Sequence, residues 1–377
     1  MQQGEIWQLV DGRSVGGIER HVCELTRALT ESGQPARAVL LAAYQPHGFA
    51  DLLRIEGVPS TVLDGTIPGL LAALRRHRPG LLHTHGYKAG IVGRICARLF
   101  GIPVVSSFHA GERAGWPVGL YQQIDSLTSV LARRISVSRE IAARLALPSE
   151  TIDNFVSPPK VDLDLALPRR AAFVGRLSHE KGPDLFCEIA RGFGAGLQWH
   201  VFGDGPMRRD LERDYGDQVM FHGHAADMSS VWPHIGLLVM PSRAEGLPMA
   251  ALEAMARGIP VAASNVGGLP ALLEPVARQL IFPAGDVAAA RIAVQHWQAL
   301  TAEEQAGLRL ENRRRIEQNY SPAAVLPKIL AVYRAAGREP SRSSTTIVQS
   351  SDCSSGSDAA TAWANRAAAS STVNPAV

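Results

Sequence analysis

Residues 241–258 read PSRAEGLPMAALEAMARG, and this stretch predicts one short, buried helix. Pro248 suits the first helical turn, because the N–H that proline lacks would have no partner there anyway. The run 249–256 consists of strong helix formers, and Gly258 followed by Pro260 is a stop signal. A helix that is apolar nearly all round is normally buried against other elements.

Two carboxylates interrupt this apolar stretch, Glu245 before the helix and Glu253 in its middle. A buried carboxylate is costly unless a hydrogen bond or an opposite charge compensates it. Glu253 therefore needs a partner. An arginine of the chain could form an internal salt bridge with it, or a group of a bound ligand could fill that place, and the helix alone leaves both readings open.

Outward from this helix, short apolar runs alternate with helix-like segments, which is the rhythm of parallel sheets. In the first half we expect strands at 6–10, 36–43, 80–86 and 102–109 and helices at 17–32, 68–77 and 88–100. The rhythm restarts with strands expected at 171–177, 197–203, 218–223, 235–242, 259–264 and 279–282. The fold class is therefore α/β, with two doubly wound domains whose strand ends border a ligand-binding cleft.

The changes in composition along the chain set the expected domain boundaries. We expect an N-terminal domain over 1–156, a linker over 157–170, a C-terminal domain over 171–320 and a last helix over 321–338 that packs back on the N-terminal domain. Residues 339–377 are rich in Ser, Ala and Thr, so we expect a disordered tail.

The composition excludes several classes of protein. The 377 residues are 46% hydrophobic and 19% charged with a net charge of +3, and there is no basic stripe with interleaved aromatic residues, so we expect no nucleic-acid partner. No apolar run reaches the length of a signal peptide or a membrane span. The four cysteines are scattered, which argues against disulfides and zinc and favours the cytoplasm. Short basic clusters at 74–79 and 133–139 favour peripheral contact with an anionic membrane surface or acceptor.

Three further motifs point to a phosphate-bearing ligand. FVGRLSHEKG at 173–182 places Arg176 and Lys181 just beyond a strand, where two cations suit a diphosphate, although a solvated basic turn would look the same. GGIERHV at 16–22 puts glycines before a helix, which fits either phosphate or a plain tight turn. VFGDGP at 201–206 has Arg208 where a dinucleotide fingerprint would have its last glycine, so an NAD-dependent oxidoreductase is disfavoured.

Together these motifs resemble the retaining glycosyltransferases of the GT4 family, which have the GT-B fold of two Rossmann-like domains facing across a cleft. The E-x7-E element corresponds to Glu245 and Glu253, and GRLSHEKG at 175–182 resembles the family's G-R-x-x-x-x-K-G element. VFGDGP, VMPSRAEGLP at 239–248 and VGGLP at 266–270 match in order. The resemblance covers about 5–335 and is strongest over 171–275; it departs from the family at Phe155 and Ala271.

The resemblance implies roles for particular residues. Arg176 and Lys181 would hold the diphosphate of a nucleotide-sugar donor, and Glu253 would accept hydrogen bonds from the ribose. Glu245 and His109 would face the transferred sugar. Gly17 would lie over the phosphates, and Gly246 and Leu247 would give amides to the sugar or phosphate. Of these, His109, Arg176, Lys181 and Glu245 are the expected catalytic residues.

The expected reaction transfers a hexose or an N-acetylhexosamine to a cell-envelope glycan or a lipid-linked acceptor, with retention and without a cofactor or metal. Cations at the leaving phosphate can replace a metal there. Asp162-x-Asp164 only superficially resembles a metal-binding pair, since it falls in the linker. A non-catalytic scaffold or an epimerase on the same fold are the alternatives. His83 and His85 either line the acceptor side or form a satisfied histidine pair.

Overall fold

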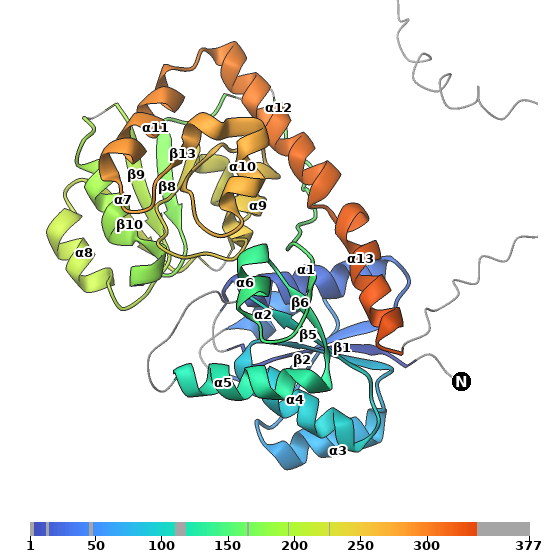
Figure 1. The fold of residues 1–377 in the computed structure, drawn as a ribbon. Helices are drawn as coiled ribbons and strands as arrows, with labels where there is room; N and C mark the ends of the chain where they lie inside the picture. The colour runs from blue at the N-terminus through green and yellow to red at the C-terminus, as the bar shows by residue number, and fades with distance from the viewer. Residues whose placement is uncertain are drawn as a thin grey trace, which may run out of the picture. The chain divides into compact units, whose positions relative to one another are not determined.

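A computed structural model describes residues 4–12, 15–44, 48–109, 118–163, 166–194, 196–225 and 227–337. The expected tail at 339–377 and Asp164 of the linker pair lie outside these ranges. Two parallel sheets, each with helices on both faces, form the described chain (Figure 1). The expected α/β class with two doubly wound halves is therefore confirmed.

The first sheet has seven strands in the order β3-β2-β1-β4-β5-β6-β7, and neighbouring strands run parallel. The strands are β1 (Ile6–Val10), β2 (Ala36–Leu40), β3 (Ser60–Val62), β4 (Leu81–His85), β5 (Val104–Phe108), β6 (Arg133–Ser136) and β7 (Glu150–Thr151). Val10 at the end of β1 pairs with His85 at the end of β4. These two central strands therefore end at the same edge.

Helices cover both faces of the first sheet because its strands are apolar on both sides. Trp7 and Leu9 of β1 pack toward α3 (Ile67–His77) and α4 (Tyr87–Leu99). Ile6 and Val10 pack on the opposite face, which is covered by α1 (Gly17–Glu31), α2 (Phe49–Ile55) and α13 (Pro322–Ala335). The other elements are α5 (Val118–Thr128), the 3-10 turn η1 (Ser129–Leu131) and α6 (Arg139–Arg144).

The second sheet has six parallel strands in the order β10-β9-β8-β11-β12-β13. The strands are β8 (Arg170–Val174), β9 (Gln198–Phe202), β10 (Val219–Gly223), β11 (Leu237–Met240), β12 (Val261–Ser264) and β13 (Ile281–Phe282). Ala171 and Phe173 of β8 pack toward one set of helices and Ala172 toward the other. This alternation gives the second half two cores as well.

One of these cores forms around α7 (Pro183–Ala190), α8 (Arg208–Tyr215) and α11 (Val287–Ala299), and the other around α9 (Met249–Met255), α10 (Leu269–Ala277) and α12 (Ala302–Asn319). Three 3-10 turns complete this half: η2 (His179–Lys181), η3 (Trp232–His234) and η4 (Arg278–Leu280). Five of the seven residues of α9 are buried. The helix expected from the apolar run at 249–256 is therefore present and is a core element.

The chain passes from the first half to the second through 157–169 and returns through α12 and α13. Val325, Ile329 and Val332 of α13 join the core of the first half. Where the two passages meet, the N–H of Val156 donates to the carbonyl of Tyr320 at 3.0 Å. Among the described residues, no helix has both the length and the apolar character needed to cross a membrane.

Candidate active site

The order of the strands reverses between β1 and β4 in the first sheet and between β8 and β11 in the second. Loops that leave neighbouring strands at such a point diverge, and parallel sheets bind ligands in the space between them. The residues expected to form the site follow these strands or the adjacent β5. Gly17 comes after β1, His109 after β5, Arg176 and Lys181 after β8, and Glu245, Gly246, Leu247 and Glu253 after β11.

The loop after β8 carries the two expected diphosphate ligands. Arg176 is exposed, and Lys181 ends the turn η2. The next residue, Gly182, has φ 68°, and a Cβ there would lie 2.3 Å from the carbonyl oxygen of Pro241. Only glycine fits such a conformation and such a close approach. Gly182 therefore lets the loop after β8 pack directly on the loop after β11.

This packing brings Lys181 and Glu245 together. Lys181 Nζ donates to Glu245 Oε2 at 2.8 Å, and Ser242 Oγ donates to Glu245 Oε1 at 2.9 Å. The side chain of Glu245 is 3% exposed and that of Lys181 is 30% exposed. The carboxylate is therefore fixed from both sides, while the ammonium group still reaches solvent.

Gly246 and Leu247 connect Glu245 to α9. The carbonyl of Leu247 accepts a hydrogen bond from Asn154 Nδ2 at 2.8 Å, and a Cβ on Gly246 would lie 3.1 Å from the carbonyl oxygen of His109. Loops of both halves thus meet at this point. Within the described ranges, the N–H groups of Gly246 and Leu247 donate to no acceptor. Two such amides beside a fixed carboxylate suit a ligand that carries phosphate or hydroxyl oxygens.

Glu253 on α9 has partners inside the chain. Trp232 Nε1 donates to its Oε2 at 3.2 Å, and Arg20 Nε lies 3.9 Å from its Oε1. Burial raises the pKa of Glu253, and the nearby Arg20 and Arg257 oppose that rise. A separation of 3.9 Å is too long for a hydrogen bond. The internal salt bridge considered for Glu253 therefore exists only as a long contact.

Gly17 begins α1 on the other side of this point. It is exposed, and a Cβ there would lie 4.0 Å from Met249 Cγ of α9. The first turns of α1 therefore bring both Gly17 and Arg20 next to the helix that carries Glu253. The expected donor residues lie in three kinds of place: Glu253 in the middle of α9, Gly17 at the start of α1, and the others in the loops after β8 and β11 (Arg176, Lys181, Glu245, Gly246 and Leu247).

A buried network of polar side chains lies at the ends of β4 and β5. Gln8 Nε2 donates to the Tyr333 hydroxyl at 3.1 Å, and Gln8 Oε1 lies 2.8 Å from His85 Nε2. His85 Nδ1 lies 3.2 Å from His109 Nε2. His83 bonds Tyr333 through Nδ1 and Ser107 through Nε2, each at 2.8 Å. His83 and His85 are thus hydrogen-bonded through both ring nitrogens, as expected for a satisfied pair.

The directions of these hydrogen bonds assign the tautomers. Because Gln8 Oε1 can only accept, the proton of His85 is on Nε2 and its Nδ1 is the acceptor. His109 must then donate its Nε2–H to His85, which leaves Nδ1 of His109 without a proton. Burial lowers the pKa of both histidines well below the usual value, with smaller effects from neighbouring imidazoles. His109 is therefore neutral and can accept a hydrogen bond at Nδ1.

His21 of α1 completes this cluster. Burial lowers its pKa to about 4, and its Nδ1 is buried without a partner in the described chain. Among the described residues, His21, His85 and His109 are the group that could hold a metal ion, with one ring nitrogen of each within 4.8 Å of the others. This group lies on the first sheet, whereas the expected diphosphate ligands lie on the second.

Sequence reasoning missed the residues that support the expected site. Trp232 and Arg20 contact Glu253, and Gln8 and Tyr333 orient the histidines. Trp232, Gln8 and Tyr333 belong to no motif, and nothing in GGIERHV at 16–22 indicates that its Arg20 contacts Glu253, which is far away in the sequence. The one available signal was chemical: a glutamate in an apolar helix and a histidine pair on an apolar strand both require hydrogen-bond partners.

Comparison with known protein families agrees with this geometry. The model of the glycosyl transferase 4-like domain matches residues 16–155, and the model described as glycosyl transferases group 1 matches residues 168–298. The two matches correspond to the two sheets. They meet at the region that links the halves.

Characterised relatives extend the match over most of the chain. 2-Deoxystreptamine glucosyltransferase of Streptomyces kanamyceticus is 30% identical over an alignment that covers 72% of this chain and 87% of the relative. 2-Deoxystreptamine N-acetyl-D-glucosaminyltransferase of Streptomyces fradiae is 28% identical, with 73% of this chain and 81% of the relative covered.

Solved structures share the fold. Anabaena Alr3699/HepE in complex with UDP-glucose superposes with a TM-score of 0.75 at 17% identity, covering 88% of this chain and 100% of that one. Sucrose-phosphate synthase of Thermosynechococcus elongatus gives 0.72 at 19% identity, with 88% and 98% covered. The two matched domains, the ordered motifs and the relatives together show that this chain belongs to the group 1, GT4-type glycosyltransferases of GT-B fold and is an enzyme that transfers a sugar from a nucleotide-sugar donor.

Proposed function

We propose that the enzyme transfers a hexose or an N-acetylhexosamine from a nucleotide diphosphate sugar with retention of anomeric configuration. The observation that carries this proposal is the contact between Lys181 and Glu245, which brings a cation and a carboxylate from two loops together where the strand order of the second sheet reverses. A cation suits the diphosphate, and a carboxylate suits sugar hydroxyls. Arg176, exposed on the same loop, supplies a second cation.

In the proposed reaction, an acceptor hydroxyl attacks the anomeric carbon from the face on which the diphosphate leaves. The new bond joins the acceptor oxygen to that carbon, and the bond between the carbon and the phosphate oxygen breaks. The leaving diphosphate takes the bonding electrons, and one of its oxygens takes the hydroxyl proton. Negative charge thus grows on the diphosphate, where Arg176, Lys181 and the amides of Gly246 and Leu247 would stabilise it.

The remaining site residues position the donor. Glu253 would accept hydrogen bonds from the ribose through Oε1, the oxygen that the Trp232 indole does not occupy. His109 would accept a hydrogen bond from a sugar hydroxyl at Nδ1, since its other nitrogen donates to His85. Gly17 would let the backbone after β1 approach the phosphates. These contacts involve groups that do not react, so they mainly set donor affinity and orientation.

We further propose that the reaction needs no metal. Two side-chain cations and two amides near the expected phosphates can carry the charge that a metal carries in other enzymes. The histidine group that could bind a metal belongs to the first sheet and is tied into a hydrogen-bond network with Gln8.

For the acceptor we propose a cell-envelope glycan or a lipid-linked glycan, with the enzyme in the cytoplasm and in peripheral contact with the membrane. One relative, from Escherichia coli, is UDP-Gal:alpha-D-GlcNAc-diphosphoundecaprenol alpha-1,3-galactosyltransferase, and it is 26% identical with 54% of this chain and 62% of the relative covered. Free cysteines at 23, 96 and 187 fit a reducing compartment.

A thermal-shift screen against nucleotide sugars, followed by product analysis, tests this function. A donor present at 100 times its Kd should stabilise the protein by about 2.7 kcal/mol. The stabilising donor should then give a product whose anomeric proton coupling matches that of the donor. An inverted product would refute retention. Donor binding without release of nucleotide diphosphate in the presence of any acceptor would indicate a non-catalytic scaffold, and conversion of the donor sugar itself would indicate an epimerase.

A further inference from the structure

Exposed apolar side chains gather on the helices of the first half. Of the fifteen large hydrophobic residues exposed in the described chain, eight lie on α4, α5 and η1. They form what we call the apolar face: Ile95, Leu99, Leu120, Tyr121, Ile124, Leu127, Val130 and Leu131. Single exposed hydrophobic residues need no explanation, but a contiguous group marks an interaction surface.

The apolar face is continuous because its helices pack side by side. Leu120, Ile124 and Leu127 are spaced by four and three residues, so they share one side of α5. α4 contacts α3 on one flank and α5 with η1 on the other, and Figure 1 shows α3, α4 and α5 along the same side of the first sheet. Leu99 is 69% exposed, Leu127 75% and Val130 65%.

The charge around this face is strongly positive. Residues 65–139 contain two acidic residues, Glu112 and Asp125, against ten basic ones: Arg75, Arg76, Arg78, Lys88, Arg94, Arg98, Arg113, Arg133, Arg134 and Arg139. Asp125 is buried and bound to Arg94. Arg75, Arg76, Arg98 and Arg133 are exposed. Within the described residues of 65–139, no carboxylate therefore reaches the surface.

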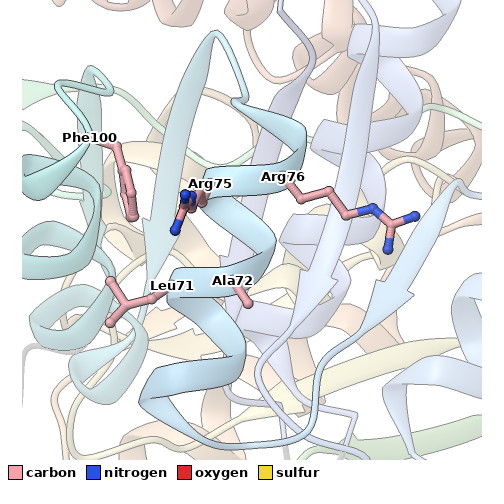
Figure 2. Close-up of a pocket in the computed structure, with 5 residues that line it drawn as sticks. All are labelled: Leu71, Ala72, Arg75, Arg76 and Phe100. Atoms are coloured by element: carbon pink, nitrogen blue, oxygen red, sulfur yellow. The ribbon is translucent and has the colours of Figure 1, made fainter.

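A cavity of about 620 Å³ adjoins the apolar face, lined by Leu71, Ala72, Arg75, Arg76 and Phe100. Figure 2 shows Leu71, Arg75 and Phe100 on one side of α3, while Arg76 projects from the other side. Phe100 directly follows the exposed Leu99. The cavity thus combines an apolar wall with guanidinium groups.

We propose that this face docks on an anionic lipid bilayer, with the apolar side chains in the interfacial layer and the arginines on lipid phosphates. Apolar side chains surrounded by arginine without exposed carboxylate are the pattern of interfacial membrane binding. Two copies of this face would bring arginines against arginines, and like charges facing each other across an interface are unfavourable. The charge therefore favours an anionic bilayer over a second copy of the chain.

The inference rests on the proposed lipid-linked acceptor, because it says where that acceptor is presented. α4 begins directly after His85, and α5 is the next helix after His109. The helices of the apolar face therefore start from the same edge of the sheet as the site. Leu120 and Tyr121 lie at the start of α5 near this edge, whereas Leu99 and Leu127 lie in the last turns of α4 and α5, toward the opposite edge. A protein docked through the apolar face would therefore lie with α4 and α5 along the bilayer, and the site would border one end of the face.

Vesicle co-sedimentation tests the inference without requiring transfer activity. The full chain should bind vesicles of phosphatidylcholine with phosphatidylglycerol and should not bind pure phosphatidylcholine. Leu127→Gln with Val130→Gln should weaken binding at least about ten-fold at any salt concentration. Both wild-type side chains are exposed to water in the free protein, so their transfer into the bilayer is favourable, and glutamine removes that gain. Arg75→Gln with Arg76→Gln should weaken it about 25-fold at low salt, about five-fold per arginine, and much less at high salt.

Matched controls lie on the second half. Ile292→Gln on α11, which replaces a side chain that is 65% exposed, and Arg209→Gln on α8 should leave vesicle binding unchanged. No binding of the wild type to anionic vesicles, or equal loss in the control variants, would overturn the proposal. A wild-type dimer that Leu127→Gln with Val130→Gln dissociates would overturn it in favour of a second copy. Transfer to a water-soluble acceptor should be unchanged in the variants of the apolar face, so a failure of membrane docking is distinguishable from a failure of the proposed reaction.

Discussion

Replacing Lys181 with methionine keeps most of the side chain and removes its charge. In the protein without donor, this change leaves the carboxylate of Glu245, which is 3% exposed, with the Ser242 hydroxyl alone. Removing one partner of a buried, charged hydrogen bond costs about 1–3 kcal/mol. For a half of this size, that cost lowers Tm by roughly 2–12 °C.

The same variant has a separate kinetic effect if Lys181 contacts the leaving diphosphate. A charge-assisted contact of about 1.5–3 kcal/mol corresponds to a loss of roughly 10- to 150-fold in kcat/KM. Because the negative charge grows as the bond breaks, we expect kcat to fall together with kcat/KM.

A double-mutant cycle separates the two effects. Lys181→Met, Glu245→Gln and the double variant are compared by thermal unfolding and by donor kinetics. The double variant should regain much of the lost Tm, because glutamine carries no charge that needs a partner. The loss of kcat caused by Lys181→Met should persist in the Glu245→Gln background. If the double variant is as fast as Glu245→Gln alone, Lys181 acts only by holding Glu245, and it does not belong to the diphosphate site.

Three further outcomes are expected. Burial raises the pKa of Glu253, so the ionised carboxylate destabilises the folded state above that pKa. Glu253→Gln should therefore keep or raise Tm at neutral pH while it raises the donor KM. A lower Tm with an unchanged KM would remove Glu253 from the site. The pKa of His21 is about 4 in the folded protein against 6.5 when the side chain is exposed. The stability that the neutral His21 side chain contributes is therefore fully present above about pH 6.5 and is lost as the pH falls toward 4. Over this range the free energy of unfolding should fall by up to about 1.4 kcal/mol per pH unit. Urea unfolding at several pH values should show this slope, and His21→Leu should flatten it; parallel profiles would mean that His21 is solvated. Turnover should survive excess EDTA, and a loss that Mn²⁺ or Mg²⁺ restores would contradict a metal-free reaction.

The sequence predicted the positions of strands best where a strand is central in its sheet and buried on both faces. The strand at 6–10 and the helices at 249–256 and 88–100 lie within one residue of their expected bounds. The edge strands β3 and β7 were not foreseen, because they have three and two residues and carry no sustained apolar pattern. The inner strand β6 was not foreseen either, because it has four residues and begins with Arg133 and Arg134. The strand expected at 235–242 ends at Met240, because the chain leaves the sheet there to form the loop that carries Glu245.

The sequence predicted only those site residues that belong to its motifs, and it did not predict the contacts between them. The two motifs placed Lys181 and Glu245 after different strands, and the structure joins them in one ion pair. Nothing in the sequence indicated that Glu245 and Lys181 would neutralise each other in the free protein, because that contact depends on the close packing at Gly182. The tautomer of His109 is set by Gln8 on β1 through His85, and only a three-dimensional network determines it.

The hydrogen bond from Val156 to Tyr320 has a consequence for motion. The chain passes between the halves twice, and this bond holds the two passages together at 3.0 Å. If both passages stay fixed at one point, the halves cannot slide past each other and can only rotate about that point. The distance between Lys181 on one half and His109 on the other would then change only through such rotations. The amide proton of Val156, which lies at this point, should exchange slowly whether or not a nucleotide-sugar donor is added.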